Sequence, residues 1–382
     1  MKATNDDLFT GKGVQHGLCR TNTGNIQSVW FEFTQNCDLR CQYCFVGENA
    51  NLCKTSHMDK QNVVLMLDEC KKLGVDSIGI PGTGEPFYGG NTEFTMWFLR
   101  ECEQRGMYVT LFTTGAHITP ELAAELYKLP VELMLKCNSL DPVRQDKFVS
   151  GKEEIIVGYG ELRNKAIEIL MAAGFNDRDA ARIYGRESRM ALVTSIMTDD
   201  QESGLDNLDE IADIYRYCRK NNIIADIDTI LKRGRALECG LKSGDQRVMP
   251  VLAELRQIAV EEFGDSEVSL SSTYVETVCD RFHHHLYVDY KGRIRPCIGA
   301  MDVDLGTFPE TSLEEAWNSE ERCIIRERKF AGACVECANF QEEKCHSCLG
   351  RRTPTEGEKK LTNESLLRDG AVWTTGCPMF RR

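Results

Sequence analysis

The chain of 382 residues lacks the features that direct a protein to a membrane, out of the cell or onto a nucleic acid. No apolar run approaches the roughly 20 residues that a membrane-spanning helix needs. The polar run Asn5-Asp6-Asp7 stands where a secretory signal would be apolar. The net charge is −13, and no basic stripe runs along the chain to face phosphates. We therefore expect a cytoplasmic protein with no membrane or nucleic-acid partner.

Cysteine, in contrast, is abundant, with 18 residues in the chain. Disulfides are rare in the cytosol, so we interpret these cysteines as metal ligands or as small buried hydrophobes. Cys37, Cys41 and Cys44 form a C-x3-C-x2-C motif directly after the apolar stretch Ser28–Phe33. Three thiolates on one loop can hold three irons of a cubane [4Fe–4S] cluster and leave the fourth iron open to a small molecule. A zinc site or a plain ferredoxin cluster is the alternative for this spacing.

A second motif lies about forty residues further on, at Ser77–Pro86. An apolar run that ends in glycines predicts a buried strand followed by a flexible loop. Glycines let backbone carbonyl and amide groups approach a ligand closely, and Glu85 supplies a negative charge for an ammonium group. Taken alone, this motif also fits an ordinary strand-to-helix turn.

Together the two motifs resemble those of the radical S-adenosylmethionine (radical SAM) enzymes. Tyr43 occupies the aromatic position of C-x3-C-x-aromatic-C, and Thr83-Gly84-Glu85-Pro86 is similar to the Gly-Gly-Glu-Pro motif, with threonine for the first glycine. The resemblance implies a [4Fe–4S] cluster on Cys37, Cys41 and Cys44 whose open iron chelates SAM. Reduction then yields a 5′-deoxyadenosyl radical that abstracts hydrogen from the substrate. Residues implied to contact SAM are Tyr43, Thr83, Gly84, Glu85, Ser139, Thr194, Ser195 and Ile196.

Strand and helix signals alternate after residue 27 and predict an α/β protein with a parallel sheet. The expected strands are Ser28–Phe33, Ser77–Pro81, Tyr108–Thr113, Val131–Ser139, Met190–Thr198 and Ile223–Leu231. The expected helices are Lys60–Leu73, Glu93–Gln104, Pro120–Tyr127, Gly160–Ala173, Asp206–Asn221 and Gly244–Phe263. By resemblance, six strands make a partial (β/α)6 TIM-like barrel with ligands at the C-terminal ends of its strands. We predict an N-terminal extension (1–27), the barrel (28–240), a helical bridge (241–270) and a small cysteine-rich α+β domain (271–382).

Seven further cysteines gather in the last third of the chain: Cys279, Cys297, Cys334, Cys337, Cys345, Cys348 and Cys377. Two C-x2-C pairs would fit a zinc ribbon, but seven thiols are too many for one zinc and one short of two four-cysteine sites. Their order resembles the SPASM extension of radical SAM enzymes, which carries auxiliary iron–sulfur clusters. The resemblance implies a distal cluster on Cys334, Cys337, Cys345 and Cys377, and a proximal one on Cys279, Cys297 and Cys348.

The SPASM resemblance is imperfect at two points. The central spacing is x7 then x2 instead of x5 then x3, and residues 273–278 contain no extra cysteine. We therefore expect the proximal cluster to have an open iron, fewer irons, or a non-cysteine ligand such as Glu276 or His283.

Two other cysteines are candidate hydrogen-atom donors to a substrate radical, as in radical epimerases. Cys137 is expected to face into the barrel together with Ser139, and Cys239 follows the sixth strand. A small packing residue in a barrel layer is the alternative for each. Ile298 follows Cys297 where related sulfatase-maturing dehydrogenases have an aspartate, so alcohol oxidation by that route needs a histidine or another carboxylate.

The leading hypothesis is an enzyme that epimerises, oxidises or dehydrates a small polar natural-product intermediate, such as a sugar or aminocyclitol. It would receive electrons from a donor such as flavodoxin or ferredoxin. Only 36 residues precede Cys37, which leaves no room for the leader-binding domain of many peptide-modifying relatives. The alternatives are a peptide maturase whose leader recognition lies on another protein, and a non-catalytic iron–sulfur scaffold.

Overall fold

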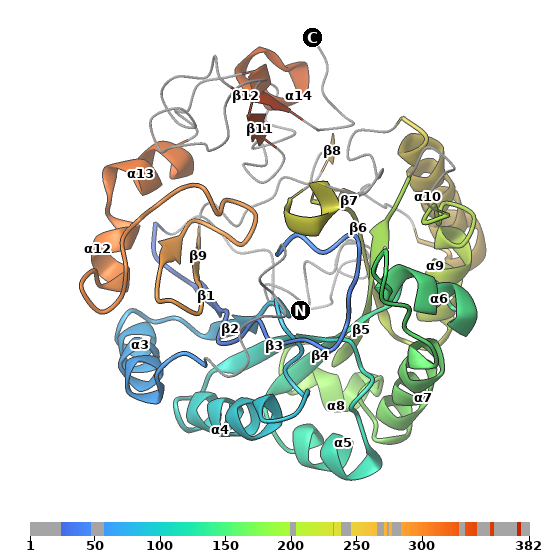
Figure 1. The fold of residues 1–382 in the computed structure, drawn as a ribbon, viewed down its shortest axis with the longest axis horizontal. Helices are drawn as coiled ribbons and strands as arrows, with labels where there is room; N and C mark the ends of the chain where they lie inside the picture. The colour runs from blue at the N-terminus through green and yellow to red at the C-terminus, as the bar shows by residue number, and fades with distance from the viewer. Residues whose placement is uncertain are drawn as a thin grey trace.

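The computed structural model describes residues 24–46, 57–198, 204–231, 233–237, 246–265, 271–272, 275–276, 284–327, 333–341, 352–354 and 373–375. Parallel strands alternate with helices, and the helices lie outside the strands in an incomplete ring (Figure 1). The predicted α/β class and partial barrel are therefore confirmed. None of the helices in the described ranges is long and apolar enough to cross a membrane.

Six parallel strands form the barrel, and each pairs with the next in sequence. They are β1 (Ser28–Phe31), β2 (Ser77–Ile80), β3 (Tyr108–Thr113), β4 (Val131–Lys136), β5 (Met190–Ile196) and β6 (Ile224–Thr229). All six were predicted, and their carboxyl ends share one rim because parallel strands run in the same direction.

The outer layer of the barrel consists of α3 (Lys60–Lys72), α4 (Asn91–Gln104), α5 (Pro120–Tyr127), α6 (Pro142–Val149), α7 (Tyr159–Ala172), α8 (Arg178–Arg182), α9 (Ile211–Lys220) and α10 (Val248–Phe263). Thr119 caps α5 as the Thr-Pro pair predicts, because its hydroxyl accepts a hydrogen bond from the backbone N–H of Leu122 (3.2 Å). Helix α6 was not predicted. Asp141 and Pro142 carry the same start signal, but they follow directly on the strand expected to end at Ser139.

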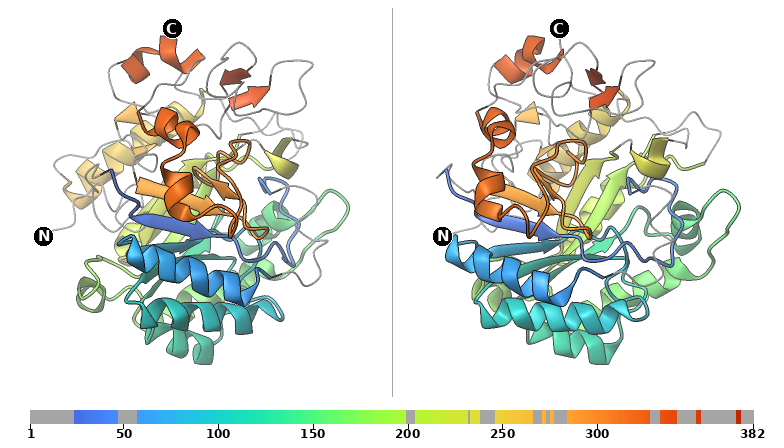
Figure 2. Two further views of the ribbon diagram at one scale, coloured as in Figure 1. Left: turned by 90° about the vertical axis from the view of Figure 1, so that its left-hand side faces the viewer. Right: turned by 60° about the vertical axis from the view of Figure 1, so that its left-hand side comes forward.

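The C-terminal part of the chain adds two strands to the barrel sheet, which the sequence did not predict. Strand β9 (His285–Val288) pairs in parallel with β1, and β10 (Ile294–Arg295) pairs antiparallel with β9. Helices α12 (Leu313–Trp317) and α13 (Glu320–Arg326) lie beside this edge, as the two side views also show (Figure 2). Residues after β10 are thereby brought to the mouth of the barrel.

The remaining described elements are short. They are η2 (Gly234–Leu237), β7 (Ser271–Ser272), β8 (Val275–Glu276), η3 (Ala333–Glu336), α14 (Ala338–Gln341), β11 (Arg352–Pro354) and β12 (Trp373–Thr375). β7 pairs with β8, and β11 pairs with β12. The domain limits given above stay predictions.

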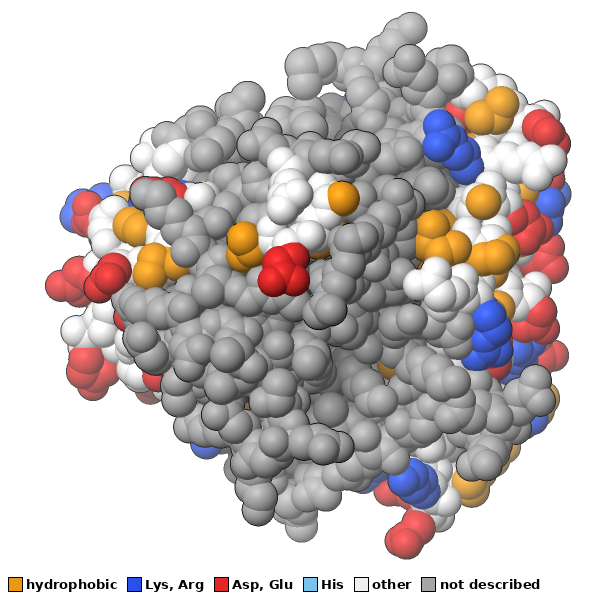
Figure 3. Space-filling view, turned by 90° about the horizontal axis from the view of Figure 1, so that it is seen from above, with side chains coloured by type: hydrophobic (Ala, Val, Ile, Leu, Met, Phe, Trp, Pro, Cys, Tyr) orange, Lys and Arg blue, Asp and Glu red, His pale blue; other side chains and the backbone are white. Residues whose placement is uncertain are grey.

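The two faces of the barrel strands pack in different hydrophobic clusters. Phe31, Leu133 and Leu192 lie on the outer face and join the main core with the helices. Trp30 and Met134 lie on the inner face, in separate clusters. Because side chains alternate along a strand, only the residues on the inner face can reach a ligand inside the barrel. On the face shown in Figure 3, the basic side chains of the described residues stand interspersed with acidic ones.

Candidate active site

A cavity of about 270 Å³ lies at the C-terminal rim of the barrel. It is bounded by the loops that follow β1, β2, β3 and β6 and by side chains of β4 and β5. Of the predicted site residues, the structure brings together here Cys37, Cys41, Tyr43, Cys44, Thr83, Gly84, Glu85, Thr194 and Ser195. The cavity is therefore the candidate site for both sequence motifs.

All three cysteines of the first motif line this cavity. Burial, and after it the charge of Cys44, raises the pKa of the Cys41 thiol to about 11. Burial, followed by the charge of Cys41, also raises the pKa of Cys37. Cys37 and Cys41 thus favour their neutral forms until a cation binds and displaces their protons. Three thiols on one wall fit a cluster held at three corners.

The described side chains do not form a ready-made metal site. Within the parts of the chain that the structure describes, no three His, Cys, Asp or Glu side chains stand around one point at ligating distance. The loop therefore brings the thiols to a common cavity without fixing them around a common centre.

The cysteine loop is braced from two sides. Asp38 accepts a hydrogen bond from Nε2 of His117 in the loop after β3 (2.8 Å), and this contact raises the pKa of His117. Arg40 forms an ion pair with Glu154 (2.6 Å) and donates to the backbone carbonyl of Cys37 (3.3 Å). His117 and Glu154 are far from the cysteine loop in sequence, so the folded barrel positions the loop.

The glycine-containing loop packs directly on the cysteine loop. A Cβ atom on Gly84 would lie 2.7 Å from the carbonyl oxygen of Asn36 and 2.9 Å from its nitrogen, so only glycine fits. The backbone N–H of Glu85 donates to the same carbonyl (2.9 Å). The Glu85 carboxylate is buried, which raises its pKa, and it accepts hydrogen bonds from Thr113 Oγ1 (2.6 Å) and the Thr114 N–H (2.7 Å).

Of the residues predicted to contact SAM or to donate hydrogen, the described residues Cys137, Ser139 and Ile196 do not line the cavity. Cys137 is packed in the outer core, with its Sγ 3.6 Å from the carbonyl oxygen of Ser139, and Ile196 lies in the same core. The inward orientation predicted for Cys137 and Ser139 is wrong, because the inward side chains on β4 are Met134 and Lys136. A hydrogen-atom donor role for Cys137 has no support from this placement.

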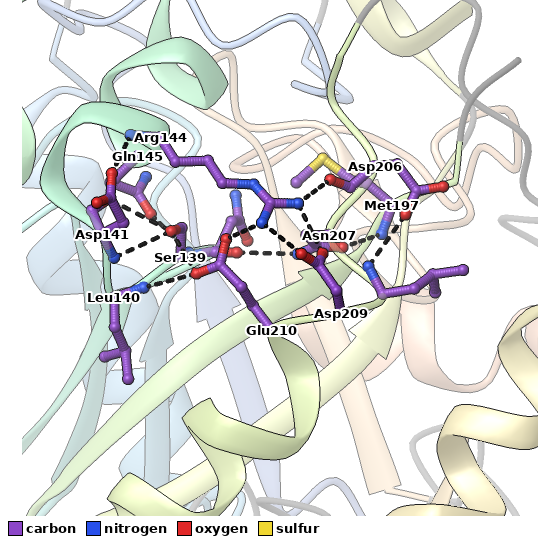
Figure 4. A network of polar contacts seen from close by, with 12 residues as sticks. Ser139, Leu140, Asp141, Arg144, Gln145, Met197, Asp206, Asn207, Asp209 and Glu210 are labelled. Atoms are coloured by element: carbon purple, nitrogen blue, oxygen red, sulfur yellow. Dashed lines mark hydrogen bonds and ion pairs between the residues drawn. The ribbon is translucent and has the colours of Figure 1, made fainter. Parts of the chain in front are cut away.

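Ser139 instead belongs to a network that ties the end of β4 to α9 (Figure 4). Its hydroxyl donates to Oε2 of Glu210 (2.5 Å), which also accepts from the backbone N–H of Leu140 (3.2 Å). Arg144 pairs with Glu210 (2.6 Å) and with Asp209 (2.7 Å). The contacts shown for Ser139 are therefore those of a structural residue.

Sequence reasoning missed the charged residues of β4 and β6 that line the cavity. Lys136 on β4 donates to Oγ of Ser195 (2.6 Å) and lies 5.3 Å from the ring centre of Tyr43. Burial lowers the pKa of Lys136 to about 8, and the charge of Asp226 on β6 opposes this shift. Asp228, two residues further, lines the cavity as well. The sequence pattern that could have identified these residues is a charged residue at alternate positions of strands that are otherwise apolar.

Comparison with known protein families identifies two domains in the chain. Residues 31–186 match the radical SAM superfamily, and residues 279–349 match the SPASM iron-sulfur cluster-binding domain. The chain therefore contains a radical SAM domain followed by a SPASM domain. Radical SAM domains hold a [4Fe–4S] cluster together with SAM, and SPASM domains bind auxiliary iron–sulfur clusters, so the predicted cofactors are confirmed.

Individual relatives are more distant. The chain is 29% identical over 124 residues to the tungsten-containing aldehyde ferredoxin oxidoreductase cofactor-modifying protein of Pyrococcus furiosus, covering 32% of this chain and 33% of that protein. It is 29% identical over 147 residues to the GTP 3′,8-cyclase of Geobacter sulfurreducens, covering 37% and 41%. The chain thus spans less than half the length of these curated relatives.

Solved structures share the fold over most of the chain. Streptococcus suis SuiB bound to S-adenosylmethionine has a TM-score of 0.59 at 16% identity, covering 88% of this chain and 78% of SuiB. Native anSMEcpe with bound AdoMet has a TM-score of 0.58 at 16% identity, covering 88% and 93%.

The SPASM residues are described only in part. Cys297 and Cys337 are buried, and Ile298, which follows Cys297, lines the radical SAM cavity. The side chains of Glu276 and Cys334 are not among those described. Outside the described residues lie Cys239, Cys279, His283, Cys345, Cys348 and Cys377. Their predicted roles stay predictions.

A buried carboxyl group joins β9 to the barrel beside this site. Glu32, which follows β1, accepts hydrogen bonds from the Tyr287 hydroxyl and from Nε2 of Gln35 (2.5 Å). Burial raises the pKa of Glu32 to about 7, although the hydrogen bonds from Tyr287 and Gln35 oppose the shift. Between pH 4.5 and about 7 the folded protein therefore holds the Glu32 proton more tightly than the unfolded chain does.

This pKa shift predicts how the stability of a Glu32→Gln variant depends on pH. Between pH 4.5 and about 7 the folded state binds the Glu32 proton more tightly than the unfolded state does. The contribution of Glu32 to the free energy of unfolding therefore falls as pH rises through this range. The amide cannot ionise, so we expect the variant to lose this decline, which amounts to roughly 3 kcal/mol. Urea unfolding at pH 5 and pH 8 measures the effect, with exposed Glu153→Gln as control. Equal pH dependence in Glu32→Gln and wild type would contradict the assignment.

Proposed function

We propose that the protein is a radical SAM enzyme that oxidises or dehydrates a small polar substrate, of the sugar or aminocyclitol kind, inside the barrel cavity. The observation that carries this proposal is the placement of Lys136, Asp226 and Asp228 in one cavity with the three cysteines of the radical SAM motif. Charged groups that line the same cavity as the three cysteines suit a substrate with hydroxyl or amino groups, because such groups can exchange hydrogen bonds with carboxylates and with an ammonium group.

The lining supplies binding groups of both signs. Lys136 and Arg235 are the described cations of the cavity, and Asp226 and Asp228 lie on β6. The carboxylates can accept hydrogen bonds from hydroxyl or ammonium groups of a substrate, and the cations can donate to its oxygens. Trp30 and Phe112 add apolar walls on which a ring can pack.

The residues of the chain would bind the substrate and move a proton. A cluster held by Cys37, Cys41 and Cys44 would, with SAM, supply a 5′-deoxyadenosyl radical able to remove a carbon-bound hydrogen atom from the substrate. Asp226 or Asp228, which line the same cavity, would accept the hydroxyl proton from the same carbon, and Lys136 would hold the oxygen in place. A carboxylate on β6 would thereby substitute for the aspartate that is missing after Cys297.

The position of Cys297 favours oxidation over epimerisation. Oxidising a radical to a carbonyl group releases one electron, which is the chemistry that an auxiliary cluster is suited to accept. The predicted cluster ligand Cys297 directly precedes the cavity residue Ile298. Of the two cysteines predicted as hydrogen donors for epimerisation, Cys137 packs in the outer core, and Cys239 lies outside the described residues.

The test is 5′-deoxyadenosine release by the anaerobically reconstituted protein in deuterated water. Each reaction contains SAM, a strong reductant and either a pool of glycosides and aminocyclitols or a pool of precursor peptides. We expect the sugar pool to stimulate release and to yield a product two hydrogens lighter, or one water lighter, than its substrate. Deuterium at one product carbon would replace oxidation by epimerisation. Stimulation by peptides alone would contradict the proposal and favour a peptide maturase.

A further inference from the structure

A buried arginine in the SPASM part of the chain has hydrogen-bond donors that no described residue accepts. Arg322, on α13, is completely buried. Its Nη2 donates to the backbone carbonyl of His285 (3.1 Å), whereas Nε and Nη1 have no partner among the residues that the structure describes. Its guanidinium lies 4.3 Å from the centre of the Trp317 ring. Buried, unpaired charged donors are strongly destabilising, so these two N–H groups call for an anionic partner.

The charges around Arg322 indicate where this partner lies. Burial, and after it the charge of Arg326, lowers the pKa of Arg322 to about 9. Negative charge on Cys297 or Cys323 favours the charged form of Arg322. Cys297 is buried, and it follows β10, whose partner strand β9 carries the His285 carbonyl. Cys297 is also the described residue that the SPASM pattern makes a ligand of the proximal auxiliary cluster.

We propose that Arg322 donates hydrogen bonds from Nε and Nη1 to the auxiliary cluster that Cys297 helps to hold, and thereby raises its reduction potential. A thiolate-bound cluster is anionic and gains a further negative charge on reduction. Hydrogen bonds to its sulfur atoms and a fixed positive charge therefore stabilise the reduced form more than the oxidised form. Arg322 is a tuning residue in this role, and the inference is independent of the substrate and of SAM cleavage.

The test measures the midpoint potential of the auxiliary clusters by redox titration followed by electron paramagnetic resonance. The protein is the full chain, anaerobically reconstituted, with Cys37, Cys41 and Cys44 changed to alanine so that the radical SAM cluster contributes no signal. Arg322→Gln removes the charge, and Arg322→Lys keeps the charge but loses the planar pair of donors. Arg326→Gln is the matched control, because its guanidinium lies 5.0 Å from the same Trp317 ring but is not fully buried.

We expect Arg322→Gln to lower the midpoint potential of one auxiliary signal by at least about 59 mV, a tenfold change in the oxidised-to-reduced ratio of a one-electron couple. Arg322→Lys and Arg326→Gln should each lower it less than Arg322→Gln does, because neither removes a buried pair of donors together with its charge. Unchanged potentials in both Arg322 variants would overturn the proposal. So would loss of the folded state in both, judged by circular dichroism, because Arg322 would then act only in packing. Neither result would bear on 5′-deoxyadenosine release, which tests the proposed function separately.

Discussion

Changing Cys41 to alanine is expected to abolish 5′-deoxyadenosine formation, to the level of a reaction without protein. Cys41 is the middle thiol of the three that line the cavity, and two thiols would hold a cubane cluster at only two corners. The radical SAM cluster should then be lost or degraded, whereas the auxiliary clusters stay bound. Chromatography of the nucleoside product and iron analysis of the reconstituted protein measure the two effects.

Cys70→Ala provides the matched control for this change. Cys70 is fully buried on α3, packs in the main hydrophobic core and does not line the cavity. The control should keep both its iron and its ability to cleave SAM. If Cys41→Ala still formed 5′-deoxyadenosine, the cavity would not be the site of SAM cleavage. If the wild-type protein formed none under any condition, the non-catalytic scaffold would replace the enzyme as the better hypothesis.

The parts of the site that the sequence predicted are those that are local in the chain. The three thiols lie within eight residues, and Gly84 and Glu85 lie on one loop, so the sequence groups each set directly. The resemblance to radical SAM enzymes then implied that both loops lie at the rim of the barrel, where the structure has them. The contact between the two loops has a simple physical basis, because Gly84 has no Cβ that would strike the backbone of Asn36.

The parts that the sequence missed depend on the tertiary structure. Strand β4 ends at Lys136, and the chain then turns through Ser139 into the hydrogen bond with Glu210. An extended strand was assumed to run through Ser139, which assigned Cys137 to the wrong face. Strand β9 could not be foreseen for a different reason. Its register, with His285 opposite Ser28, joins residues 257 positions apart in the sequence, and no local pattern encodes such a pairing.

Replacing Lys136 with methionine is expected to lower substrate-dependent turnover by roughly 10- to 100-fold, the usual loss when a hydrogen bond to a charged group is removed. Lys136 lies inside the cavity between Ser195 and Tyr43, and methionine preserves much of the length of its side chain while removing the ammonium group. Because the ammonium group is argued to hold the substrate oxygen, SAM cleavage without substrate should fall less than turnover. The ratio of product to 5′-deoxyadenosine measures this difference.

The pH profile distinguishes this role from simple packing. With a pKa of about 8, Lys136 is charged below that pH and neutral above it. Wild-type turnover should therefore decline as pH rises through about 8, and the decline should be absent from Lys136→Met. An exposed lysine on α3, changed in Lys72→Met, should keep the wild-type profile. A decline at the same pH in Lys136→Met would assign the titration to another group, and the ammonium group would then have no part in binding the substrate.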